Sequence, residues 1–94
     1  MDNINPTFLY ILYSESVNKY YIGISNNPQR RLHYHNTSKK GWTRRGRPWI
    51  LVFAKQFDSK QLAQDRETWI KKQKNNTIID KIVAGDFDWK FCEA

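Results

Sequence analysis

Arg31 and His35 form a pair whose residue types and spacing could do chemistry. They stand four positions apart, shortly after the segment Asn26-Asn27-Pro28. Asn can cap a helix and Pro suits its first turn, so we expect a short helix from about Pro28 to His35. Residues spaced i and i+4 share one helix face. The spacing predicts a guanidinium beside an imidazole, although a solvated helix face would show the same pair.

Glu67 is the third candidate, because a carboxylate beside an apolar helix stripe can bind a hard cation. Asp58-Ser59 offers caps for a helix that we expect to run to about Lys74. Its apolar-leaning side consists of Leu62, Ala63, Arg66, Trp69 and Ile70. Glu67 lies at the rim of that stripe. Mg²⁺ takes one or two carboxylates together with phosphate oxygens and waters. The alternative is a surface glutamate paired with Lys71 or Arg66.

Tyr10 and Tyr21 lie in two apolar, aromatic runs that we expect to be neighbouring strands. Such tyrosines are ordinarily core aromatics whose hydroxyl reaches solvent. Strand parity distinguishes Tyr21, because it shares a face with Gly23 and Ser25 while its neighbours Tyr20, Ile22 and Ile24 face the other way. Small residues beside Tyr21 leave space for another group to approach.

The elements that must position these residues follow from the pattern of the chain. Strands are predicted at 8–14, 20–25 and 49–57, the first two joined as a β-hairpin through Ser16-Val17-Asn18-Lys19. After the helix at 28–35, a basic surface loop is expected over 36–48. A further short helix is expected at 77–83, and then a tail with Trp89 and Phe91 folded back. The order predicts an α+β domain with a small, three-stranded, mainly antiparallel sheet flanked by helices.

Basic residues are segregated along the chain rather than interspersed with acids. The net charge is +7, and there is no Asp or Glu between Ser16 and Phe57. That stretch contains Lys19, Arg30, Arg31, Lys39, Lys40, Arg44, Arg45, Arg47 and Lys55. A long block of one sign indicates a polyanionic partner, with nucleic acid the leading candidate. A membrane surface is disfavoured, because the bases do not lie along one amphipathic helix.

Length and composition bound the remaining possibilities. The 94 residues predict one domain over 1–94, with a core at about 8–83 and a tail at 84–94. Cys92 is the single cysteine, so neither an internal disulfide nor a cysteine zinc site is expected. We find no run of about 20 apolar residues, and the first residues do not have the pattern of a signal peptide. We therefore expect a reducing, cytoplasmic location.

Taken together, these residues resemble the GIY-YIG nuclease superfamily. The resemblance rests on Phe8-Leu9-Tyr10, on the literal Tyr21-Ile22-Gly23, and on Arg31, His35 and the helical Glu67 in that order. Phe8-Leu9 departs from the Gly-Ile of the name and keeps only the tyrosine. The match spans about 8–83 and includes Gly46 to Trp49. Within the superfamily, the chain most resembles the compact single-domain bacterial members. Each element alone is a weak signal, but five residue types at fitting spacings are a strong joint one.

The resemblance implies hydrolysis of a DNA phosphodiester in one step with a single metal ion, Mg²⁺ or Mn²⁺. Glu67 resembles the metal ligand and Tyr10 the general base toward water. Arg31 would hold the phosphate or help Tyr10 lose its proton. Tyr21 and His35 resemble positions that orient water or relay its proton, and the sequence does not rank those two roles.

Outside these residues, the basic loop is the predicted DNA-binding surface. It comprises Lys39, Lys40, Trp42, Arg44, Arg45 and Arg47. Contacts to phosphate position a protein without reading bases, so binding is expected to be salt-sensitive and of low sequence specificity. Trp42 could stack on an unpaired base or plug the sheet. A protein partner or a homodimer would then supply specificity. The alternatives are a noncatalytic nucleic-acid-binding module that keeps the fold, and a domain that binds an acidic protein.

Overall fold

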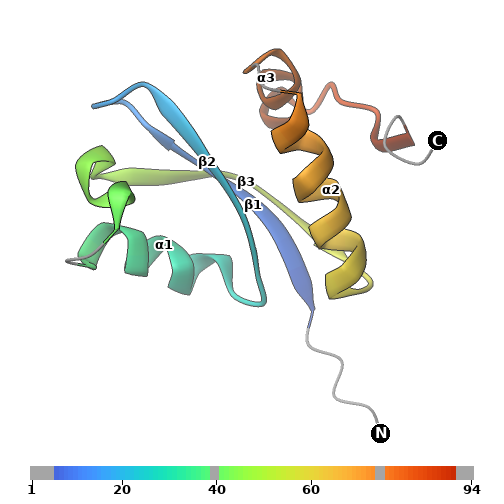
Figure 1. The fold of residues 1–94 in the computed structure, drawn as a ribbon, viewed down its shortest axis with the longest axis horizontal. Helices are drawn as coiled ribbons and strands as arrows, with labels where there is room; N and C mark the ends of the chain where they lie inside the picture. The colour runs from blue at the N-terminus through green and yellow to red at the C-terminus, as the bar shows by residue number, and fades with distance from the viewer. Residues whose placement is uncertain (1–5, 39–40, 74–75, 91–94) are drawn as a thin grey trace, which may run out of the picture.

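The computed structural model describes residues 6–38, 41–73 and 76–90. Its elements, in chain order, are β1 (Thr7–Ser14), β2 (Lys19–Ser25), α1 (Pro28–Thr37), the 3₁₀ helix η1 (Trp42–Gly46), β3 (Trp49–Phe57), α2 (Lys60–Lys72) and α3 (Asn76–Ala84). The strands form one antiparallel sheet in the order β2-β1-β3. Helix α1 lies on one face, and α2 and α3 lie on the other (Figure 1). The predicted α+β class is confirmed.

The central strand β1 is buried on both faces, which explains its nearly continuous apolar sequence. Leu9 and Ile11 point into a core cluster shared with α2 and α3. Tyr10 and Leu12 point the other way, into a second cluster with Trp49. The sheet therefore separates two packed layers. The second layer holds Tyr10, one of the two tyrosines that were candidates from the sequence.

The pairing of β1 with the edge strand β2 sets which residues meet on each face. The hairpin register places Tyr10 opposite Gly23 and Leu12 opposite Tyr21. Ile22 is buried in the layer of α2, whereas Tyr21 packs against the layer of α1. The parity predicted for β2 is therefore confirmed. On the other side of β1, the pairing with β3 shifts register between Ile11 and Leu12.

Local capping explains where the helices begin and end. The Asn27 side chain accepts a hydrogen bond from the Arg30 backbone N–H at 3.1 Å, and Pro follows in the first turn of α1. The Ser59 hydroxyl caps α2 in the same way, through the Leu62 N–H at 3.1 Å. Helix α3 ends at Ala84 and is followed by Gly85, whose φ of +84° favours glycine.

The predicted loop over 36–48 is corrected by the structure. Helix α1 continues to Thr37, and residues 42–46 form η1. Thr43 and Gly46 are buried, because η1 packs against α1 and the start of β3. Glycine and arginine in this stretch hide any hydrophobic periodicity, so no helix was predicted there. The described part of this basic segment, η1, packs on the α1 layer.

Residues after α3 return to the sheet, as predicted for Trp89. Its ring stacks on Phe53 with centroids 6.0 Å apart and meets Phe57 edge-on at 5.8 Å. Phe91 and Cys92 lie outside the described residues. Among the helices that the structure describes, none has the length and apolar character needed to span a membrane.

Candidate active site

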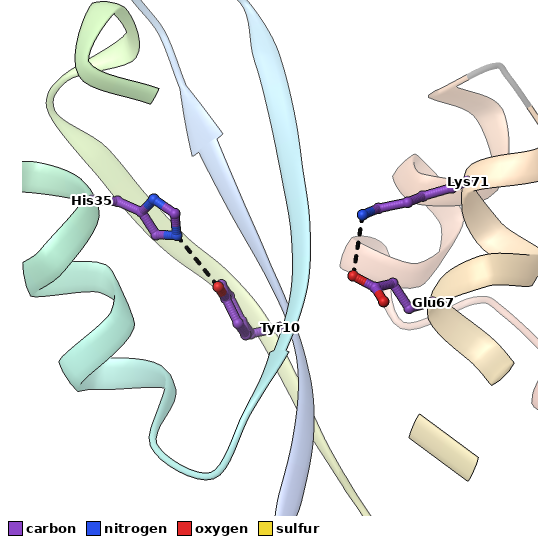
Figure 2. A network of polar contacts seen from close by, with 4 residues as sticks. All are labelled: Tyr10, His35, Glu67 and Lys71. Carbon is purple, nitrogen blue, oxygen red and sulfur yellow. Dashed lines mark hydrogen bonds and ion pairs between the residues drawn. The ribbon is translucent and has the colours of Figure 1, made fainter. Parts of the chain in front are cut away.

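Tyr10 and His35 meet in the α1 layer, although 25 residues separate them in the chain. The Tyr10 hydroxyl lies 3.3 Å from His35 Nε2 (Figure 2). Both side chains are almost completely inaccessible, with Tyr10 1% and His35 3% exposed. Strand β1 supplies the phenol and the last turn of α1 supplies the imidazole. A phenol and an imidazole at this distance can exchange a proton.

Gly23 makes the position of Tyr10 possible. A Cβ at Gly23 would lie 2.6 Å from the Tyr10 hydroxyl oxygen and 2.8 Å from Cζ. A Cβ atom does not come this close to a non-bonded heavy atom, so only glycine fits opposite the Tyr10 ring. The space that the sequence predicted beside Tyr21 is therefore filled by the Tyr10 phenol itself.

Tyr21 and Arg31 complete the group around Tyr10. The Tyr21 ring lies 4.5 Å from the His35 ring and 6.2 Å from the Tyr10 ring, measured between centroids. The Arg31 guanidinium acts on the Tyr10 hydroxyl through a hydrogen bond and through its charge. It also lies 4.7 Å above the ring of Tyr34, one turn further along α1. Four of the five predicted catalytic residues are thus brought together.

Burial sets the protonation of this group at neutral pH. Desolvation raises the pKa of Tyr10, although the Arg31 hydrogen bond and charge oppose the rise. The pKa of His35 is lowered, first by burial and then by the Arg31 charge. Tyr10 is therefore a protonated phenol at pH 7 and His35 a neutral imidazole. A neutral imidazole has one nitrogen that donates and one that accepts.

Three residues that the sequence did not single out hold His35 in place. Thr43 Oγ1 lies 3.2 Å from His35 Nδ1. The Trp49 indole N–H donates to the Thr43 carbonyl at 2.6 Å. The Asn36 side chain accepts from the Trp49 backbone N–H at 2.7 Å and donates to the Trp49 carbonyl at 3.1 Å. No sequence signal marked Thr43, since its segment looked like a loop.

The predicted DNA-binding residues occupy different environments. Arg47 is partly buried: its Nε donates to the His35 carbonyl at 3.2 Å, and its Nη2 is buried without a hydrogen-bond partner among the described residues. Arg44 and Arg45 are exposed. Trp42 belongs to η1, but its side chain lies outside what the structure describes, as do Lys39 and Lys40.

A basic cavity lies between η1 and the β1–β2 turn. It has a volume of about 510 Å³. Its lining consists of Val17, Lys19, Gly41, Arg44, Arg45 and Gly46, with no acidic residue. Lys19 was part of the charge block in the sequence but was not expected at the DNA-binding surface. The fold brings this lysine from the hairpin to the arginines of η1.

Glu67 lies apart from the other four candidates. It projects from α2 on the opposite side of the sheet, and strand β2 runs between it and Tyr10 (Figure 2). Its Oε2 accepts from Lys71 Nζ at 3.1 Å, and the glutamate side chain is 19% exposed. The surface ion pair considered as the alternative is therefore present. Helix α2, which carries Glu67, packs on both β1 and β2, on the face of the sheet opposite α1.

A metal at Glu67 would depend on few protein ligands. Within residues 6–38, 41–73 and 76–90, no three His, Cys, Asp or Glu side chains lie close enough together to hold an ion. The donor chemistry of Glu67 nevertheless fits Mg²⁺, which binds hard oxygen and keeps several waters. Its carboxylate is partly accessible, and the competing group is a flexible lysine whose side chain is 56% exposed.

Comparison with known proteins gives matches over most of the chain. The family model described as the GIY-YIG catalytic domain matches residues 6–80. A UPF0213 protein of Limosilactobacillus reuteri (strain DSM 20016) is 31% identical over 80 residues, which cover 78% of this chain and 82% of that protein. A UPF0213 protein of Streptococcus pneumoniae serotype 4 is 35% identical over 71 residues, covering 74% and 71%.

One of the similar proteins comes from a virus. Uncharacterized protein L300 of Acanthamoeba polyphaga mimivirus is 37% identical over 79 residues, which are 79% of this chain and 48% of the viral protein. No solved structure gives a significant match. The matched residues 6–80 include all five candidates, from Tyr10 on β1 to Glu67 on α2. The chain therefore belongs to the GIY-YIG family.

Proposed function

We propose that this protein is a metal-dependent endonuclease that hydrolyses phosphodiester bonds in DNA. The observation that carries the proposal is the contact of 3.3 Å between the Tyr10 hydroxyl and His35 Nε2, with Arg31 beside it. These groups lie within a domain of the GIY-YIG catalytic type. We place its action in the cytoplasm, where a chain with one cysteine stays reduced.

Tyr10 is proposed as the general base toward the attacking water. Burial raises the pKa of Tyr10, so its phenol does not ionise by itself at neutral pH. It needs an acceptor for its own proton while it takes one from water. Neutral His35 is within reach of the hydroxyl, and the Arg31 charge stabilises the phenolate character that develops.

Arg31 is proposed to bind the phosphate as well. Its planar guanidinium offers several N–H donors, and contact with Tyr10 uses only part of that capacity. Negative charge accumulates on phosphate oxygens during the attack, so a fixed guanidinium beside the base lowers the barrier. Tyr21, which packs against His35, is proposed to orient the imidazole and the water.

Glu67 is proposed to hold the divalent ion, Mg²⁺ or Mn²⁺. The ion, when bound, would polarise a nonbridging phosphate oxygen and offset charge on the departing 3′ oxygen. Lys71 must give up its contact with Glu67 Oε2, which is an exposed pair and contributes little to stability. The scissile phosphate would lie at the edge of β2, which is flanked by Tyr21 on one side and by α2 on the other.

DNA is the proposed partner, held mainly through its backbone. Lys19, Arg44 and Arg45 line one cavity whose lining contains no acidic residue, so positive charge is concentrated where a phosphate can approach. The predicted contacts of Lys39, Lys40, Trp42 and Arg47 belong to the same proposal. A homodimer or a protein partner is proposed to add specificity.

The experiment for this proposal is a cleavage assay over a panel of substrates. Purified protein would be incubated with single-stranded, duplex, branched and nicked DNA and with RNA, in Mg²⁺, in Mn²⁺ and in chelator. We expect cleavage of at least one DNA only when a divalent ion is present, and loss of cleavage in Tyr10→Phe with DNA affinity unchanged. Absence of cleavage for every substrate and ion would overturn the enzymatic proposal.

A second candidate function is a noncatalytic nucleic-acid-binding module. The observation in its favour is the position of Glu67, which is paired with Lys71 and lies across β2 from Tyr10 and His35. The same panel separates the two functions, since such a module would retard DNA in a gel at low salt and leave it intact with every metal. Retardation with cleavage favours the nuclease.

A further inference from the structure

The hydroxyl of Thr43 is an unusual feature of the α1 layer, because it is a buried polar group that faces the imidazole. Thr43 is 6% exposed and lies in η1. Its Oγ1 is 3.2 Å from His35 Nδ1, on the ring nitrogen that does not meet Tyr10. Buried hydroxyls are found with partners, and His35 Nδ1 is the partner here.

The backbone around Thr43 is anchored to the residues that flank His35. The Thr43 carbonyl accepts from the Trp49 indole at 2.6 Å. The Asn36 side chain in turn bonds both the backbone N–H and the carbonyl of Trp49. Asn36 directly follows His35 on α1. The hydroxyl and the imidazole are therefore joined by one set of hydrogen bonds that connects η1, β3 and α1.

The hydrogen-bond capacities of the neighbours favour one tautomer of the imidazole. Arg31 has only N–H donors, so it cannot accept the Tyr10 proton. The phenol proton therefore needs an acceptor, and His35 Nε2 is 3.3 Å away. Nε2 can accept only if the single ring proton of a neutral imidazole resides on Nδ1. Thr43 Oγ1 is the acceptor for that Nδ1 proton.

We propose that Thr43 is a positioning residue that holds His35 in the Nδ1–H tautomer, with Nε2 free to accept the Tyr10 proton. The tautomer is a property of the folded chain, whereas its catalytic consequence rests on the proposed nuclease function. Without the hydroxyl, the imidazole would favour the Nε2–H form and turn a donor toward Tyr10.

In hydrolysis this tautomer defines the path of the proton. The water oxygen forms a bond to phosphorus while its proton passes to the Tyr10 oxygen. The Tyr10 proton passes to His35 Nε2, and the resulting imidazolium keeps its Nδ1–H bond to Thr43. The bond from phosphorus to the 3′ oxygen breaks with its electron pair on that oxygen, which takes a proton from solvent. Regeneration returns the Nε2 proton to solvent.

The direct test is the nitrogen NMR spectrum of His35 in the unmodified protein labelled with ¹⁵N-histidine. We expect a protonated Nδ1 and an unprotonated Nε2 at neutral pH. Thr43→Val should shift the population toward Nε2–H, and Thr43→Ser should restore the original pattern. Thr37→Val is the matched control, since its hydroxyl donates to the His33 carbonyl on an exposed helix face. An Nε2–H imidazole in the unmodified protein would overturn the proposal.

Cleavage measurements add the catalytic consequence. We expect Thr43→Val to lower the cleavage rate by about tenfold or more, with DNA affinity unchanged, because proton transfer contributes roughly 10²- to 10⁴-fold. Thr43→Ser should recover most of the rate. If the unmodified protein cleaves nothing, the nuclease proposal fails and the NMR result stands alone. If it cleaves and Thr43→Val cleaves equally fast, the positioning role of Thr43 is wrong.

Discussion

At the scale of single residues, the proposed chemistry centres on one phenol that burial keeps protonated. Tyr10 is buried on the central strand, and desolvation raises the pKa of its hydroxyl. Three neighbours compensate in different ways: Arg31 supplies positive charge, His35 supplies an acceptor, and Gly23 supplies space. In the proposed mechanism, Tyr10 passes its own proton to His35 while it accepts a proton from water.

Gly23→Ala tests the packing of Tyr10 directly. The added methyl group would overlap the Tyr10 phenol, so we expect a loss of about 1–3 kcal/mol in the free energy of unfolding. Urea denaturation measures it. The double variant with Tyr10→Phe removes the nearest atom and should show a smaller cost for the methyl group. Equal costs in both backgrounds would contradict the close approach.

His35 should make the stability of the fold depend on pH. Its pKa is lowered in the folded state by burial and by Arg31, so the unfolded chain takes up the proton first as pH falls. We expect the free energy of unfolding to fall as pH drops through about 6.5, the ordinary histidine pKa, and to level off below the folded pKa. His35→Gln should remove this slope, and His33→Gln should keep it. Urea titrations at a series of pH values would measure both.

Residue-level expectations from the sequence succeeded where local geometry decides them. The facing of Tyr21 follows from strand parity, and the shared face of Arg31 and His35 follows from helix periodicity. Thr43 was missed, because its contact with His35 depends on how η1 folds back over α1. Spacing along a chain carries no information about such a return.

At the scale of elements, η1 and the start of β3 act together as a brace for α1. Asn36 binds both backbone groups of Trp49, and the Trp49 indole binds η1. Strands and helices were predicted close to their observed positions, since apolar patterning and caps determine them. The 3₁₀ helix was not, because basic and small residues around buried Thr43 resemble a solvated loop.

Asn36→Ala measures the strength of this brace. The change leaves the Trp49 N–H without its side-chain acceptor, so we expect a loss of about 1–3 kcal/mol in the free energy of unfolding. Gln61→Ala, on the exposed face of α2, is a control for loss of an amide hydrogen bond, here one to the Asp65 carboxylate. A cost no larger than that of the control would contradict a bracing role for Asn36.

The basic cavity predicts how binding responds to salt. If Lys19 contacts a DNA phosphate, Lys19→Gln should reduce the slope of log affinity against log salt by about 0.9. Lys81→Gln, on α3, removes the same charge from an exposed residue that does not line the cavity and should leave the slope unchanged. Fluorescence anisotropy over a salt series measures both. Equal reductions would point to net charge in place of a local contact.

At the scale of the whole molecule, the sheet divides the proposed machinery into two parts. Tyr10, Tyr21, Arg31 and His35 lie in the α1 layer, and Glu67 lies on α2 in the other layer. The sequence predicted all five as one site, but it could not show that β2 separates the carboxylate from the rest. The proposed nuclease mechanism places the scissile phosphate at the β2 edge, because groups of both layers are proposed to act on it.

The measurement that tests this division most directly is the single-turnover cleavage rate of Glu67→Gln in saturating Mg²⁺, beside Asp65→Asn as the matched control. Asp65 is an exposed acid on the same helix, bonded to Gln61. Loss of the metal ligand removes several kcal/mol of transition-state stabilisation, which corresponds to roughly a thousandfold or more in rate. We predict that loss for Glu67→Gln, with DNA affinity retained and Asp65→Asn near the unmodified rate. Equal rates for Glu67→Gln and the unmodified protein would contradict a nuclease that acts through Glu67.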